Sequence, residues 1–152
     1  MKRIIAASAV SIGLFLMGGG SAEAAQCSVS TTPVTFGTYD VFVPTPLDSV
    51  GSVVYRCNGG APTIAITMSA GQGAGFSPRK LFSASEWMGY NVFRDPSRTV
   101  VWGDGTGGTS FYVTASIPNN IDVSVPAYGR VDAGQDVRAG AYADHISVTI
   151  NF

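Results

Sequence analysis

The sequence predicts an all-β protein built as a β-sandwich, and three observations lead to this prediction. Val, Thr, Ser, Gly, Tyr and Phe are abundant beyond residue 25, whereas Leu, Glu and Lys, which favour helices, are scarce. Short apolar runs recur along the chain, and turn signals such as NGG, GQGAG and GDGTGG separate them. Many short strands at this spacing are typical of a sandwich of two sheets.

Each expected strand is a short run of β-branched and aromatic residues between two breakers. In chain order these runs are Val34–Phe36, Ser52–Cys57, Thr63–Ser69, Gly89–Phe93, Thr99–Trp102, Ser110–Ile117 and His145–Phe152. Two longer stretches, Tyr39–Ser49 and Ala70–Arg79, are expected to be loops because both contain prolines, which disfavour central strands. No repeat or linker divides the chain, so we expect one domain.

Residues 1–24 have the pattern of a secretory signal peptide. Two basic residues precede an apolar run over Ile4–Met17, which small residues follow. The run is shorter than the roughly 18 to 20 residues that a membrane-spanning helix needs, so a transmembrane anchor is disfavoured. Ala22 and Ala24 have the spacing of a cleavage site, and we expect the domain to comprise residues 25–152.

The cysteine count and the charge narrow the class of protein further. An exported chain with two cysteines, Cys27 and Cys57, is expected to form a disulfide, because a metal or redox site needs more ligands or a closer spacing. Closing a loop of about 30 residues stabilises a fold by roughly 3 to 4 kcal/mol. The formal net charge of −1 and the lack of a basic patch argue against nucleic acid as a partner.

The end of the chain alternates between apolar and polar residues, which is the pattern of a strand with one buried face. The apolar members are Ile146, Val148, Ile150 and Phe152. A strand of this kind normally has a neighbour on each side, yet no sequence follows Phe152 to supply one. The pattern leaves two interpretations: an ordinary edge strand of a complete sandwich, or one side of a groove that another chain fills.

Four motifs occur in order between Cys27 and Phe152. The first is a cysteine followed by VTFGTYD, with a second cysteine closing GSVVYRC. The others are GYNVFRDPSRTVVWGDGTGGT, then AYGRVDAGQDVRAGAYAD, then the alternating strand that ends in NF. Together they resemble the spore coat protein U domain family, which includes the subunits of archaic chaperone–usher pili.

The resemblance implies an incomplete immunoglobulin-like β-sandwich that lacks its last strand and is completed by a donor strand from another chain. The apolar residues of the closing strand, Ile146, Val148, Ile150 and Phe152, are then expected to line one side of the acceptor groove. The implied partners are a periplasmic chaperone, an outer-membrane usher and other pilus or coat subunits. The implied role is that of a structural subunit, exported through the periplasm to a surface fimbria or coat that supports adhesion or biofilm formation.

One feature departs from the family. Pilus subunits that polymerise usually carry a donor segment of about a dozen alternating residues before the first cysteine. Here cleavage after Ala24 leaves only Ala25 and Gln26 before Cys27. We therefore expect a subunit that accepts a strand without giving one, placed at the fibre tip or in a minor position. A different start or cleavage site would restore a donor role.

No pattern indicates catalysis, a cofactor or a metal. His145 is the only histidine and falls on the outward, polar side of the closing strand. The glycine-rich stretch Gly103–Gly108 lacks the lysine and helix of a phosphate-binding loop, and Asp104 lacks the acidic spacing of a calcium-binding loop. The sequence therefore predicts a non-enzymatic protein.

An aromatic surface that binds sugar is the alternative to the assembly role. The aromatic residues concerned are Trp87, Tyr90, Phe93, Trp102, Phe111 and Tyr112. Alternation puts Tyr90 and Phe93 on opposite faces of their strand, so core packing is favoured for part of the set. Trp87 and Met88 precede that strand and are a candidate surface contact. The alternative function is a self-contained secreted domain that binds carbohydrate or another receptor.

Overall fold

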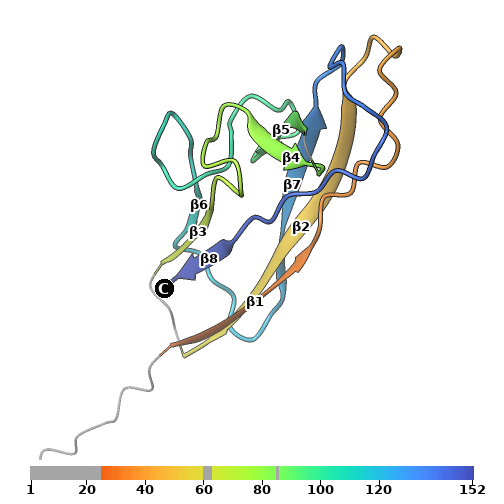
Figure 1. Cartoon of the computed structure of the whole chain (residues 1–152). Coiled ribbons are helices and arrows are strands. Elements are labelled where there is room, and N and C mark those ends of the chain that lie inside the picture. The colour runs from red at the N-terminus through yellow and green to blue at the C-terminus, as the bar shows by residue number, and fades with distance from the viewer. Residues whose placement is uncertain (1–24, 60–62, 85) are drawn as a thin grey trace, which may run out of the picture.

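A computed structural model describes residues 25–59, 63–84 and 86–152, and within these residues the chain forms eight β-strands and no helix. The strands are β1 (Gln26–Thr32), β2 (Leu47–Asn58), β3 (Ile64–Met68), β4 (Arg79–Phe82), β5 (Trp87–Phe93), β6 (Tyr112–Thr114), β7 (Val123–Val131) and β8 (Val148–Asn151). They form one sheet in the order β1-β2-β7-β5-β4 and a second in the order β6-β3-β8 (Figure 1). The predicted all-β sandwich is confirmed. The expected signal peptide lies outside the described residues.

The core lies between the two sheets because the strands turn one apolar row inward. In β2 this row is Val53, Tyr55 and Cys57, each at most 2% exposed. Trp102 is fully buried, and its Nε1 donates a hydrogen bond to the Ile66 carbonyl of β3 at 2.9 Å. Satisfying the indole N–H allows this large side chain to be buried without leaving a polar group unpaired.

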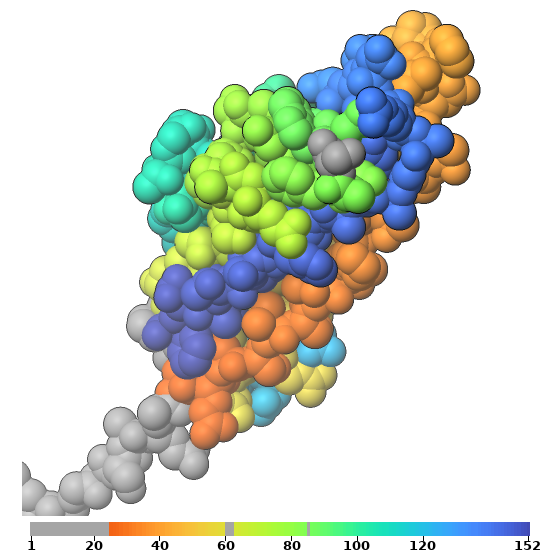
Figure 2. Space-filling model, in the orientation of Figure 1, coloured from red at the N-terminus to blue at the C-terminus, as the bar shows by residue number. Residues whose placement is uncertain are grey.

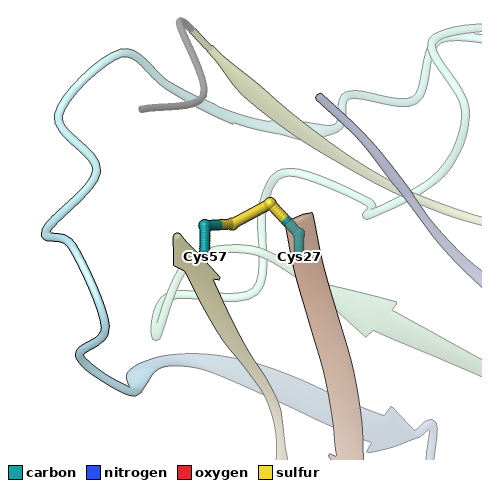
Figure 3. The surroundings of a disulfide bond; sticks show 2 residues. All are labelled: Cys27 and Cys57. Atoms are coloured by element: carbon teal, nitrogen blue, oxygen red, sulfur yellow. A yellow bond between two sulfur atoms is a disulfide. The ribbon is translucent and has the colours of Figure 1, made fainter. Parts of the chain in front are cut away.

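The disulfide expected from the cysteine count is confirmed. Cys27 of β1 and Cys57 of β2 are direct partners in the antiparallel ladder, with Cα atoms 4.1 Å apart (Figure 3). The bridge joins residues that are 30 positions apart in the chain. It therefore fastens β1 to β2, its one sheet neighbour in the part of the chain that the structure describes.

The prediction of a strand at Val34–Phe36 is wrong, because the first strand ends earlier, at Thr32. Pairing with β2 holds β1 from Gln26 to Thr32, and beyond Pro33 the chain leaves the sheet. Alternation in VTFG correctly indicates one inward face, since Val34 and Phe36 pack against the core. It does not indicate a backbone partner, and none of these residues is in a strand.

β7 lies in a stretch for which no strand was expected. Its odd-numbered residues from Val125 to Val131 form a buried row, but Pro126 argues against a central strand. Pro126 is tolerated because β5 pairs with β7 only from Tyr128 onward, so at the proline β7 has β2 alone as a neighbour. The strand expected at Thr99–Trp102 is reduced to isolated bridges at its last two residues.

β4 begins inside the expected loop Ala70–Arg79, with a charged side chain that is fully buried. The Arg79 guanidinium donates to the Ser69 carbonyl from Nε at 3.1 Å and Nη2 at 2.9 Å, and to the Trp102 carbonyl from Nη2 at 2.6 Å. Its Nη1 donates to Asn91 Oδ1 at 2.9 Å. Burial lowers the pKa of Arg79 from its ordinary value. These bonds tie β4 to the end of β3 and to Trp102.

Candidate functional site

A long groove lies between the N-terminal and C-terminal parts of the domain. β1 is one of the two outer strands of the large sheet and β8 is one of the two outer strands of the small sheet, so each has a free backbone edge within the described residues. We call residues 29–41 the N-terminal wall and residues 137–152 the C-terminal wall. The two walls run along each other in orange and dark blue (Figure 2). Both lie fully within the described residues, and no backbone hydrogen bond joins them.

The first part of the groove opens directly onto the core. It holds a cavity of about 270 Å³. The cavity floor consists of core side chains that are at most 5% exposed, among them Val53, Met68, Tyr90, Val92 and Ala127. An apolar cavity of this size between two free strand edges has the shape and chemistry to take the side chains of an added strand.

The second part of the groove continues toward the loop that leads into β2. It encloses about 810 Å³ between residues 34–41 of one wall and 137–144 of the other, over Leu81 and Met88. Val34, Phe36, Leu81 and Asp144 line both parts, so the two cavities are one continuous groove.

The N-terminal wall depends on two glycines that let it cross the inner face of the large sheet. A Cβ atom at Gly51 would lie 2.5 Å from the Thr32 carbonyl oxygen. A Cβ atom at Gly129 would lie 2.3 Å from Val34 Cγ1. The wall thus runs closely over β2 and β7, and Phe36 packs edge-on against Tyr90 with ring centroids 5.9 Å apart.

The C-terminal wall is held on one side only. β8 pairs with β3, and ahead of it the Ser69 N–H donates to the Ser147 carbonyl at 2.9 Å. Further up, Phe82 and Ala143 exchange backbone hydrogen bonds of 2.7 and 3.0 Å. Because successive backbone groups of a strand point to opposite sides, the other edge of this wall is left to face the groove.

The four residues predicted to line this wall, Ile146, Val148, Ile150 and Phe152, differ in how far they are buried. Ile146, Val148 and Ile150 are half-buried, pack against the core and face inward, while the residues between them are exposed. Ile146 and Val148 line the first cavity. Phe152 is 52% exposed at the end of the wall.

Asp144 fastens the C-terminal wall to the groove floor. Its Oδ2 accepts a hydrogen bond from the Tyr90 hydroxyl at 2.7 Å, and its Oδ1 accepts the backbone N–H of Gln72 at 2.8 Å. Burial and the hydrogen bond to this carboxylate raise the pKa of Tyr90 above its ordinary value. These two hydrogen bonds hold Asp144 in place where the two parts of the groove meet.

Sequence reasoning missed the residues of the N-terminal wall. Val29 lies opposite the buried Tyr55 and therefore faces the inner side of the sheet, yet it is 39% exposed. Val34 and Phe36 line both cavities. Their alternating apolar pattern was visible, but nothing local indicated that they face Ile146 and Val148 across a groove.

Trp87 and Met88 were predicted as a surface contact. The prediction is wrong for Met88, which is 5% exposed and packs in the core. The two residues are neighbours in β5, so their side chains point to opposite faces. Trp87 is 48% exposed, with the Lys80 Nζ 4.1 Å from its ring centroid. Tyr90 and Trp102 are buried, as core packing predicted for part of the set, so the aromatic residues considered for sugar binding do not form one exposed surface.

The polar residues of the groove make structural contacts. The Asp144 carboxylate accepts the backbone N–H of His145, and the His145 residue itself is exposed. Among the described residues no group of His, Cys, Asp and Glu has the arrangement of a metal site. Across the same part of the chain, the structure has no helix with the length and hydrophobicity to traverse a bilayer.

Comparison with known proteins places this fold in a family. The model of the Spore Coat Protein U domain matches residues 14–149, so the chain belongs to the spore coat protein U domain family. Protein U of Myxococcus xanthus is 30% identical over 132 residues, which cover 78% of this chain and 71% of that protein.

A solved structure shares the fold. It is described as the CsuC–CsuE chaperone–tip adhesion subunit pre-assembly complex from archaic chaperone–usher Csu pili of Acinetobacter baumannii. The likeness has a TM-score of 0.58 at 19% identity and covers 85% of this chain and 40% of the matched chain. The present chain thus spans less than half of that chain's length. The fold of this chain is an incomplete immunoglobulin-like sandwich.

Proposed function

We propose that this protein is a non-enzymatic structural subunit of a chaperone–usher surface fimbria or coat, and that a strand donated by another chain fills its groove. The observation that carries the proposal is the pair of free strand edges on either side of an apolar cavity that opens onto the core. A strand added there gains backbone hydrogen bonds from both walls, while its alternate side chains enter the cavity. Membership of the spore coat protein U domain family adds support.

The partners follow from this mode of assembly. A periplasmic chaperone is proposed to fill the groove first, an outer-membrane usher to receive the subunit, and another subunit to replace the chaperone strand. An exposed, unpaired edge beside apolar side chains promotes aggregation, so a chaperone strand would protect the subunit during export. The assembled subunit is proposed to act at the cell surface in adhesion or biofilm formation.

We also propose that the subunit accepts a strand and does not give one, which suits a tip or minor position. The support is the expected cleavage after Ala24, which leaves two residues before Cys27. The mass of the mature N-terminus tests this point. A mature protein that begins well before Ala25 would restore a donor role and leave the groove proposal intact.

Photo-crosslinking tests the groove directly, because neighbouring positions of the C-terminal wall face opposite ways. A photoreactive amino acid is placed at Val148, which faces the groove, or at Thr149, which is exposed, in the full chain expressed in its own host. We expect capture from position 148 of an extended, alternating segment of a chaperone or pilus subunit, identified by mass spectrometry. Equal capture from both positions, or a monomer that captures nothing, would contradict the proposal and favour the self-contained carbohydrate-binding domain.

A further inference from the structure

The loop at one end of the groove carries the most exposed large apolar side chain on the described part of the molecule. Phe42 is 91% exposed and Val43 is 43% exposed. We call residues 42–46 the mouth loop. It connects the N-terminal wall to β2 and lies at the end of the molecule remote from the C-terminus, in orange (Figure 1).

The mouth loop is a defined turn that points Phe42 outward. The Phe42 N–H donates to Asp40 Oδ1 at 2.9 Å, and the Val43 N–H donates to the Asp40 carbonyl at 3.2 Å. Pro44 and Pro46 restrict the chain that follows. A phenyl ring held in water by a turn is unfavourable for the isolated domain, so a partner that covers it gains apolar burial.

The loop is continuous with the groove. Val41 lines the second cavity, and Phe42 is the next residue. Val137 is at the same end of the opposite wall. The two walls run in opposite directions, so an added strand is antiparallel to one wall and parallel to the other. A donor strand that is antiparallel to the C-terminal wall, as β3 is to β8, leaves the groove between Val41 and Val137. The folded body that follows it then comes to lie against the mouth loop.

We propose that the mouth loop docks on the folded body of the protein whose strand fills the groove, with Phe42 as the anchor. This inference rests on the proposed function and adds a second contact outside the groove. The partner is expected to present an apolar hollow next to the C-terminal end of its donated strand. A buried aromatic anchor at the centre of such a contact typically controls the rate of dissociation.

The test compares two probes on the full mature chain. One is the intact protein identified by crosslinking at position 148, and the other is a synthetic peptide that copies only its crosslinked segment. For Phe42→Ser we expect the intact protein to dissociate about 10-fold faster or more. The peptide is expected to dissociate within about two-fold of its rate from the wild type, because it does not reach the mouth loop.

Val113→Ser is the matched control. Val113 is 55% exposed on β6, at the edge of the small sheet away from the groove, and its replacement is expected to change neither rate. An unchanged rate for intact protein from Phe42→Ser would overturn the inference. Equal loss with both probes would also overturn it, because Phe42 would then act inside the groove. A wild-type chain that binds neither probe would refute the proposed function itself.

Discussion

Replacing Ala127 by leucine is expected to change the stability of the unoccupied chain and its affinity for a donated strand in opposite directions. Ala127 is 3% exposed and lies on the floor of a cavity of about 270 Å³. Leucine carries extra carbons into that space. At about 0.8 kcal/mol per buried methylene, the variant gains roughly 2 kcal/mol of unfolding free energy when no strand is bound.

The same carbons occupy the space that a donor side chain needs. If one bulky side chain of the donor is kept out, binding loses the roughly 1.5 to 3 kcal/mol of its burial. That loss corresponds to a dissociation constant about 10- to 150-fold larger. A cavity that merely reflects loose packing would give the gain in stability without the loss in affinity.

Both quantities are measured on the same protein. Urea unfolding of the refolded chain, followed by tryptophan fluorescence, to which the buried Trp102 contributes, gives the free energy of unfolding. Titration with the peptide of the crosslinked segment gives the affinity. Ala65→Leu is the control because Ala65 faces away from the core, between the buried Ile64 and Ile66 of β3. An Ala127→Leu variant that binds as tightly as the wild type would refute the assignment of this cavity to a donor side chain.

Three further predictions concern the walls and the floor of the groove. Replacing both Cys27 and Cys57 by serine is expected to lower the unfolding free energy, measured by urea unfolding, by roughly 3 to 4 kcal/mol. A loss below about 1 kcal/mol would show that the disulfide contributes little to the stability of the fold. Gly51→Ala is expected to lower the free energy of unfolding by about 1 to 3 kcal/mol, because its Cβ would lie 2.5 Å from the Thr32 carbonyl oxygen. Gly75→Ala is the control: the nearest atom to its Cβ would be 3.9 Å away, so a smaller loss is expected. Burial raises the pKa of Tyr55 to about 12 and that of Tyr90 above its ordinary value, so both stay protonated in the folded chain at a pH where they ionise in the unfolded one. The contribution of the two tyrosines to the free energy of unfolding is therefore fully present below about pH 10 and is lost as the pH rises further. Tyr90→Phe should make the fall of the unfolding free energy with pH less steep, by up to about 1.4 kcal/mol per pH unit. An equally steep fall in both proteins would mean that Tyr90 ionises freely in the fold.

Local patterns were sufficient for β3, β5 and β8, but not for β7, although β7 has a neighbour on each side in the large sheet. β3 alternates over its whole length and β5 from Tyr90 onward, and the predicted ranges overlap the observed ones. β4 was missed because it is short and begins with Arg79, a residue type that normally indicates the surface. Nothing in the local sequence shows that three carbonyl and amide oxygens from other segments receive this guanidinium.

The candidate groove was predictable on one side only. The C-terminal wall could be identified because Ile146, Val148 and Ile150 alternate with polar residues. The N-terminal wall could not, since its position depends on a crossing over Gly51 and Gly129, which are far apart in the chain. Alternation indicates which side of a segment faces the core, but it carries no information on whether the backbone edge has a partner.

The bridge between Cys27 and Cys57 makes the groove dependent on the compartment in which the chain resides. Among the described residues β1 has a neighbour on one side only, and the disulfide at its start links it to that neighbour through side chains. In a reducing cytosol these thiols stay apart, and the first strand can fray from the sheet. Under the proposed function, oxidation after export would set the moment at which the molecule becomes competent to accept a donated strand, and earlier association inside the cell would be disfavoured.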